Sequence, residues 1–355
     1  MIVARQKRSA WITFVLLGAG LAILPLLVEA GIGRSWVRVI DFTLLYIILA
    51  VGLNIVVGYA GLLDLGYIAF YAVGAYCYAL LASPQFGLHL PFWAILPIGA
   101  AAAALFGILL GAPTLRLRGD YLAIVTLGFG EIVRIFLNNL NTPVNITNGP
   151  QGITLIDPIR IAGFSFAAKH HWLGLTFSSP QQYYYLFLTL TLALIFVALR
   201  LQDSRIGRAW AAIREDELAA AATGINVRNL KLLAFAMGAT FAGVAGGLFA
   251  GFQGFVSPES FNLMESVMIL CMIVLGGMGN IPGVILGATL LTVLPEALRY
   301  LGDWQQAWLG RIVVDPDDLR MLLFGLALIV MMLYRPAGLW PSRLRRREWE
   351  DQRTS

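Results

Sequence analysis

The fold is organised around one charged stretch, Ser204–Lys231, which reads SRIGRAWAAIREDELAAAATGINVRNLK. Arginine, lysine, aspartate and glutamate crowd this stretch, whereas the sequence on either side is apolar. Charged side chains are costly in hydrocarbon, so the stretch is expected to lie in water or against another protein. The alanines at Ala219–Ala222 favour a helix, and Gly224 suits the left-handed turn that ends one. We therefore predict a short helix outside the membrane, held between two membrane spans.

Two interpretations of this helix are open. Its apolar residues Trp210, Ile213, Leu218 and Ala221 recur at roughly helical steps and form a stripe on one face. A partner outside the membrane could hold such a helix and move the two spans that flank it. Alternatively, the helix is a solvated connection, which is the usual role of a charged loop.

The composition of the chain indicates a membrane protein. Its 355 residues are 59% hydrophobic and 13% charged, whereas soluble domains carry about 25% charged residues. We expect residues 1–355 to form a single transmembrane domain, an all-α bundle of membrane-spanning helices. The two cysteines, Cys77 and Cys271, lie in apolar segments and allow neither a disulfide framework nor a zinc site.

Ten apolar runs are expected to be membrane helices, each near the length of about 20 residues that crosses the hydrocarbon. They are Trp11–Val28, Val39–Val57, Leu65–Ala82, Phe92–Thr114, Tyr121–Leu137, Tyr183–Arg200, Leu232–Phe252, Glu265–Gly276, Ile281–Leu298 and Leu319–Tyr334. The run Glu265–Gly276 is too short to span alone and is interpreted as half of a broken helix. No small-residue cleavage site follows the first run, so we expect it to stay in the protein.

The basic residues predict the orientation of the chain. With ten spans, both termini lie on the same side of the membrane. Arginine and lysine are concentrated on that side, which is therefore expected to be cytoplasmic. The N and C termini are then cytoplasmic, together with the charged loop at residues 204–231 and the basic tail at residues 335–355. The long loop at residues 138–182 faces outward.

Glycine is dense in two apolar segments, GLNIVVGYAGLLDLGY at residues 52–67 and GGMGNIPGVILG at residues 276–287. Segments interrupted by glycine and proline in both halves of a membrane protein are typical of broken helices that line a transport path. Close packing of helices through small residues is the alternative explanation.

The sequence lacks the motifs of an enzyme. It has no G-x-x-x-x-G-K-[ST] loop for a nucleotide, its three histidines fall in predicted loops, and no nucleophile–base pair is identifiable. We therefore expect no catalytic residues, no metal site and no cofactor bound by the chain itself.

Ionisable residues inside predicted spans are functional candidates, because they are expensive to place there. Glu131 and Arg134 stand three residues apart on one predicted helix, so they can also pair with each other structurally. The candidate residues of a substrate path are Asn54, Tyr59, Asp64, Tyr67, Glu131 and Glu265.

The motifs together resemble the membrane subunit of branched-chain amino acid ABC importers, and in particular its larger, M-type permease. The matching motifs, in chain order, are GLNIVVGYAGLLDLGYIAFYAVGAY, LRLRGDYLAIVTLGFGEIVRI, TNGPQGI, IGRAWAAIREDELAAAATGINVRNLKLLAF, SPESF, VLGGMGNIPGVILGA and YRPAGLWP. They extend from Leu44 to Trp340. Permeases of urea and short-amide importers share much of this pattern and remain an alternative, as does an ion-coupled secondary carrier.

The resemblance implies a multi-pass subunit of the bacterial inner membrane, in which residues 138–182 form a periplasmic loop. Its implied partners are a paralogous permease that completes a heterodimer, two cytoplasmic ATPase subunits that use ATP, a periplasmic substrate-binding protein and the lipid bilayer, with no nucleic acid. The substrate is a branched-chain or related amino acid.

The resemblance also identifies Arg208–Gly224 as the coupling segment that docks on the ATPase. Its candidate residues are Arg208, Trp210, Ile213, Arg214, Glu215, Asp216, Glu217 and Gly224. The wider importer motif has Glu-Ala-Ala with a glycine six residues after the glutamate; here Leu218-Ala219-Ala220 occupies that place, with Glu217 one residue earlier. Asp64 stands where the family has a small polar residue, so it either alters substrate choice or forms a structural ion pair.

Overall fold

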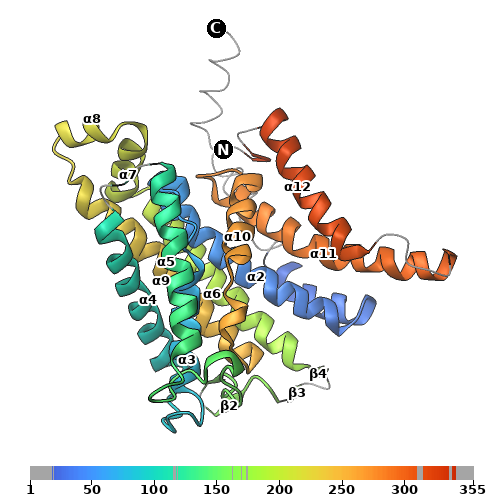
Figure 1. The fold of residues 1–355 in the computed structure, drawn as a ribbon. Helices are drawn as coiled ribbons and strands as arrows, with labels where there is room; N and C mark the ends of the chain where they lie inside the picture. Colours follow the sequence, from blue (N-terminus) through green and yellow to red (C-terminus); the bar gives the residue numbers. More distant parts are fainter. Residues whose placement is uncertain are drawn as a thin grey trace, which may run out of the picture.

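The computed structural model describes residues 18, 20–114, 117, 119–161, 163–168, 170–172, 175–309, 315–335 and 338–340. Within these ranges the protein is mainly helical (Figure 1). The all-α, polytopic membrane architecture predicted from the sequence is therefore confirmed. Two predicted features lie largely outside the described residues, namely the basic tail after Arg335 and the first half of the span Trp11–Val28.

The predicted apolar runs are helical over most of their described lengths, although the run Leu65–Ala82 is helical only from Ile68 to Leu81. The helices are α2 (Arg34–Asn54), the π-helix η1 (Ile55–Tyr59), α3 (Ile68–Leu81), α4 (Phe92–Thr114), α5 (Asp120–Asn139), α6 (Ser179–Gln202), α7 (Arg205–Glu215), α8 (Glu217–Ala222), α9 (Val227–Gln253), α10 (Leu263–Gly276), α11 (Ile281–Leu309) and α12 (Pro316–Tyr334). An apolar helix at Gly20–Gly31 precedes them. α4 has the predicted bounds, whereas α11 continues to Leu309 instead of ending at Leu298.

Six helical segments within the described ranges are long and apolar enough to cross a membrane. They are Arg34–Tyr59, Phe92–Thr114, Ser179–Gln202, Val227–Gln253, Pro258–Gly276 and Ile281–Tyr300. The helices α3 and α10 have 14 residues each, or about 21 Å at 1.5 Å per residue, which is less than the ~30 Å of hydrocarbon. Irregular chain precedes both, as expected of broken helices. Ten crossings and cytoplasmic termini stay predictions.

The centre of the bundle is formed by α9, which packs against α3 and α4. Gly74 on α3 lies against Gly243 on α9, and a side chain at Gly74 would overlap the backbone of Gly243. Small residues allow this approach, which membrane helices use because lipid provides little hydrophobic force between them. Most of α2 and α9 is buried, whereas most of α6 is not. Helix α9 is therefore the element that a movement must reach to rearrange the bundle.

The loop at residues 138–182, which was predicted to face outward, contains structure that the sequence did not predict. It holds the 3-10 turn η2 (Gly149–Gln151) and two antiparallel hairpins, in which β1 (Arg160–Ile161) pairs with β2 (Phe164–Ser165) and β3 (His170–Trp172) pairs with β4 (Leu175–Phe177). These hairpins lie at the opposite end of the bundle from α7 and α8 (Figure 1).

Candidate functional site

The coupling segment is two helices rather than the single helix predicted. Helix α7 ends at Glu215, Asp216 is extended with φ −153° and ψ 112°, and α8 begins directly after it. The Asp216 carboxylate accepts hydrogen bonds from the backbone N–H groups of Leu218 (2.8 Å) and Ala219 (3.0 Å). An aspartate that caps a new helix in this way interrupts the preceding one. Gly224 follows α8 with φ +86°, in the left-handed region predicted for it.

The inner face of the coupling segment fixes it to α9. Trp210 is fully buried, and its Nε1 donates a hydrogen bond of 2.8 Å to the backbone oxygen of Leu230. Ile213 is buried as well. Glu217 on α8 pairs with Lys231 at 2.8 Å between Oε1 and Nζ, and the lysine side chain is 5% exposed. Because Leu230 and Lys231 belong to the start of α9, these contacts hold the coupling segment directly against α9.

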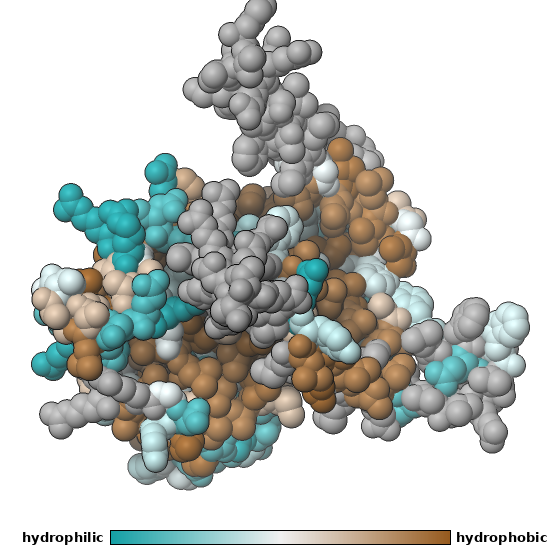
Figure 2. Space-filling model, turned by 90° about the horizontal axis from the view of Figure 1, so that it is seen from above, coloured by the Kyte–Doolittle hydropathy of each residue, from teal (hydrophilic) through white to brown (hydrophobic). Residues whose placement is uncertain are grey.

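The outer face of the coupling segment is exposed. Arg208 and Glu215 are exposed, and Leu218 is 69% exposed. The predicted apolar stripe from Trp210 to Ala221 is therefore wrong beyond the break at Asp216, where the chain turns Leu218 and Ala221 outward. Seen from this end of the molecule, hydrophilic side chains gather on the side where α7 and α8 lie (Figure 2).

The ion pair between Glu217 and Lys231 provides a test of how the coupling segment is held. We predict that Glu217→Ala destabilises the protein by about 3 kcal/mol, because it leaves a buried ammonium group unpaired. Thermal unfolding of the purified protein in detergent measures this loss. The matched variant Glu215→Ala removes an exposed carboxylate two residues away and should change stability by less than about 0.5 kcal/mol. Equal effects of the two variants would contradict a structural role for the pair.

Arg214 joins the coupling segment to both glycine-rich segments. Its Nη1 donates a hydrogen bond of 2.6 Å to the carbonyl oxygen of Gly58 in η1. The side-chain oxygen of Asn54, at the end of α2, accepts a hydrogen bond of 2.8 Å from the backbone N–H of Gly279. Gly279 has φ +83°, and a β-carbon on it would lie 3.4 Å from Nη1 of Arg214. The Arg214 guanidinium group thus joins the coupling segment to η1 and lies beside Gly279, which Asn54 in turn holds against the end of α2.

The other candidates from the first glycine-rich segment lie inside the protein. Asp64 is fully buried, and its Oδ1 accepts the backbone N–H two residues later at 2.9 Å, an Asx turn that leads into α3. Its Oδ2 has no hydrogen-bond partner among the described atoms. The Tyr67 hydroxyl donates a hydrogen bond of 3.1 Å to the Gly238 carbonyl. The Tyr59 hydroxyl donates one of 3.3 Å to Oε1 of Gln202. These bonds connect α3 and η1 to neighbouring helices, and substrate contact by these residues stays a prediction.

Glu131 and Arg134 form the predicted ion pair. Nε of Arg134 donates to both carboxylate oxygens of Glu131 at 3.1 Å, and its Nη1 donates to Glu259 at 3.3 Å. Glu259 was not recognised as a partner from the sequence, because it lies far from α5 in the chain. Glu265, the remaining candidate, accepts a hydrogen bond of 2.8 Å from the Tyr46 hydroxyl and so links α10 to α2.

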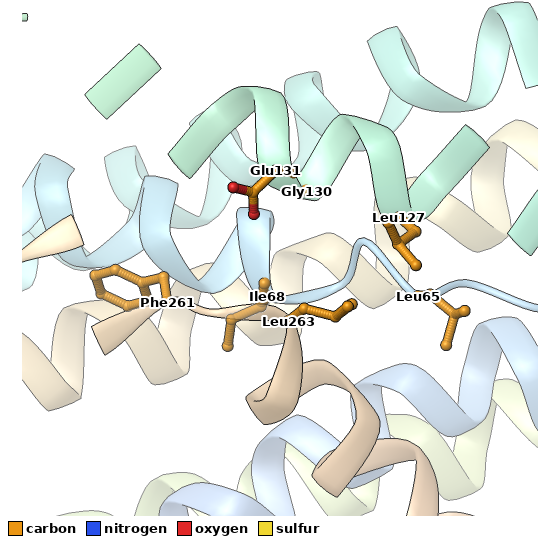
Figure 3. Close-up of a pocket in the computed structure, with 7 residues that line it drawn as sticks. All are labelled: Leu65, Ile68, Leu127, Gly130, Glu131, Phe261 and Leu263. Carbon is orange, nitrogen blue, oxygen red and sulfur yellow. The ribbon is translucent and has the colours of Figure 1, made fainter. Parts of the chain in front are cut away.

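A cavity of about 170 Å³ lies beside Glu131 (Figure 3). It is lined by Leu65, Ile68, Leu127, Gly130, Glu131, Phe261 and Leu263. Helix α5 forms one wall, and the chain that enters α3 and α10 forms the other (Figure 3). Because these walls come from three separate parts of the sequence, no local motif could have predicted the cavity. Within the described residues, no cluster of His, Cys, Asp and Glu is arranged to hold a metal ion.

Comparison with known proteins identifies relatives over most of the chain. The family model for the permease component of branched-chain amino acid transport systems matches residues 35–332. The high-affinity branched-chain amino acid transport system permease protein LivM of Escherichia coli K12 is 47% identical over 322 residues, which cover 87% of this chain and 71% of the relative. A probable LivM of Methanocaldococcus jannaschii is 27% identical, over 77% of this chain and 74% of the relative. The high-affinity branched-chain amino acid transport system permease protein LivH of Salmonella typhimurium is 26% identical, over 83% of this chain and 90% of the relative. No solved structure matches the chain.

The family match extends from α2 into α12 and so includes both glycine-rich segments, the coupling segment and the cavity. The family predicted from the motifs is therefore the correct one, and the chain is a transport permease rather than an enzyme. The chain belongs to the permease family of branched-chain amino acid transport systems, among the ABC importer permeases of the LivM type.

Proposed function

We propose that this chain forms one half of the translocation path through which an ABC importer moves branched-chain amino acids. The support for the substrate is the 47% identity to a permease whose name states high-affinity transport of these amino acids. The related LivH permeases support pairing with a paralogous permease. The pair lies in the bacterial inner membrane, and this chain crosses it ten times with both termini in the cytoplasm.

The energy for transport comes from partner subunits. The chain has no phosphate-binding loop, so two cytoplasmic ATPase subunits bind and hydrolyse ATP, and the chain needs no cofactor of its own. A periplasmic binding protein delivers the substrate to the outer end, where the loop at residues 138–182 lies.

The contact of Arg214 with Gly58 carries the proposed mechanism. The ATPase docks on the exposed face of the coupling segment, around Leu218 and Arg208. Closure of the ATPase dimer displaces the segment, and the Trp210–Leu230 hydrogen bond passes this displacement to α9. Arg214 passes it at the same time to η1 and to the loop at Gly279, which are the broken parts of the bundle. The path between the two permeases then alternates between outward and inward access.

Reconstitution of the complete importer tests the proposal. The chain is produced together with a paralogous permease, two ATPase subunits and a periplasmic binding protein from the same organism, and the complex is placed in liposomes that contain ATP. We expect leucine uptake that requires both ATP and the binding protein, with no uptake of urea. Uptake of urea instead would establish the amide-transporter alternative. Leucine uptake by this chain alone, driven by an ion gradient, would establish a secondary carrier.

A further inference from the structure

The cavity beside Glu131 combines an apolar interior with charged groups at one edge. Its interior walls are the side chains of Leu65, Ile68, Leu127, Phe261 and Leu263. In Figure 3 these side chains surround the space between α5 and the chain that enters α3 and α10, and the Glu131 carboxylate lies above Ile68. Dry apolar cavities of about 150 Å³ hold a ring as small as benzene. A space of about 170 Å³ therefore suits one branched aliphatic side chain.

The Glu131 carboxylate lies at the edge of the cavity, and its ion-pair partner Arg134 stands three residues further along α5, outside the cavity lining. The Glu131 and Arg134 side chains are 40% and 25% exposed, although both stand on a helix that carries many exposed apolar residues, such as Ile132 and Phe136. Ionisable residues on membrane helices face a water-filled cavity or another protein rather than lipid. This surface of α5 is therefore expected to face the path, with a carboxylate and a guanidinium group side by side.

The hydrogen bonds of Arg134 differ in how easily a ligand could replace them. Two bonds of 3.1 Å join its Nε to Glu131 three residues away on the same helix, and its Nη2 donates a third, shorter bond to Oε1 of Glu131. The bond from its Nη1 to Glu259 is longer, at 3.3 Å, and the Glu259 side chain is 65% exposed. A carboxylate that reaches this edge can take the place of Glu259 at low cost, because an exposed ion pair contributes little.

We propose that this cavity is the substrate subsite of the permease and takes a zwitterionic amino acid with a branched aliphatic side chain. The side chain enters the space between Leu127 and Leu263, the ammonium group binds the Glu131 carboxylate, and the substrate carboxylate binds Nη1 of Arg134 in place of Glu259. The inference rests on the proposed function and adds to it the place where the substrate is recognised. An ion pair with opposite charges beside an apolar cavity matches each part of such a substrate.

Protection of an engineered thiol tests the subsite. In the complete importer, Cys77 and Cys271 are replaced with alanine and Leu127→Cys places a thiol in the cavity wall. Labelling by N-ethylmaleimide is followed with and without leucine. At leucine concentrations about ten times the dissociation constant, labelling should be about tenfold slower, because only the free sites react. Glycine, which lacks the side chain, and 4-methylpentanoate, which lacks the ammonium group, should not protect.

Two control variants separate binding from structure. Ile132→Cys carries a thiol on an exposed part of α5 outside the cavity, and leucine should not change its labelling. Glu131→Gln should weaken leucine protection by about tenfold to a hundredfold, the value of a hydrogen bond to a charged group. Glu296→Gln removes the carboxylate of an ion pair with the same three-residue spacing, Glu296–Arg299 at 3.1 Å on α11, and should leave protection unchanged.

The outcomes distinguish the subsite from the function. If the wild-type complex imports leucine but leucine does not slow labelling of the Leu127→Cys thiol, the subsite is wrong and the function stands. If 4-methylpentanoate protects as well as leucine, the cavity is a general apolar site and the subsite is equally wrong. If the wild-type complex imports urea and not leucine, the proposed function itself fails.

Discussion

Replacing Arg214 with alanine is expected to leave ATP hydrolysis by the importer intact while leucine uptake falls by about tenfold or more, the value of one hydrogen bond from a charged donor. The reason is its position: Nη1 of Arg214 binds the Gly58 carbonyl at 2.6 Å, and it is the charged group that connects α7 to η1 and to the loop at Gly279. Without it the ATPase still moves α7, but the broken segments no longer follow. The measurement is the ratio of leucine imported to ATP hydrolysed in proteoliposomes.

Arg208 provides the matched control for Arg214. It lies on the same helix, is exposed, and donates a hydrogen bond of 3.0 Å to the backbone oxygen of Asp203, which lies between α6 and α7. Arg208→Ala should therefore keep a normal transport ratio as long as the ATPases remain bound. A normal ratio for Arg214→Ala as well would show that the contact at Gly58 does not transmit the movement.

Replacing Leu218 with aspartate is expected to release the ATPase subunits while the permease pair stays assembled. Burying a leucine contributes about 1.5–3 kcal/mol, and a carboxylate in the same apolar contact adds a desolvation cost. Association should then weaken by at least about a hundredfold, since each 1.4 kcal/mol is a factor of ten. Co-purification of the ATPases with the tagged permease measures the loss, and Leu218→Met should retain them because its size and polarity are similar.

Leu155 offers a control for the addition of a charge at an exposed leucine. It is 77% exposed and lies in the loop at residues 138–182, at the other end of the molecule. The Leu155→Asp variant should therefore still co-purify with the ATPases. If Leu218→Asp retains the ATPases equally well, the coupling segment is a solvated connection and not a docking site. Reversing the charges of Asp216 and Glu217 is a poorer test, because Asp216 caps α8 and Glu217 holds Lys231.

The apolar runs of the sequence predicted the helices well, because an apolar segment of a membrane protein enters lipid and must form a helix there. The lipid forces every backbone group to find a partner within its own segment, so an apolar run such as Phe92–Thr114 becomes a helix with nearly the same bounds. The rule fails where the chain leaves the apolar region. Helix α11 continues past Leu298 to Leu309. At the predicted end, Glu296 and Arg299 form an ion pair three residues apart on the helix surface.

The candidate site was less predictable than the fold, because its geometry depends on contacts between distant residues. The sequence identified Arg214 and Glu131, but it gave no sign that one binds the Gly58 carbonyl or that the other borders a cavity with Phe261. It also placed Leu218 on the same apolar stripe as Trp210 and Ile213, since periodicity alone does not reveal that Asp216 accepts two backbone N–H groups and restarts the helix.

The short helix α3 has a consequence for the lipid that surrounds the protein. A continuous membrane helix adjusts to a thicker or thinner bilayer by tilting. Helix α3 cannot adjust in this way, because its 14 residues are continued by the irregular chain before it and its Gly74 lies directly against the α9 backbone. Hydrophobic mismatch must then be absorbed by the bilayer itself or by peripheral helices such as α6. The permease is therefore expected to work best in membranes whose hydrocarbon thickness matches its own.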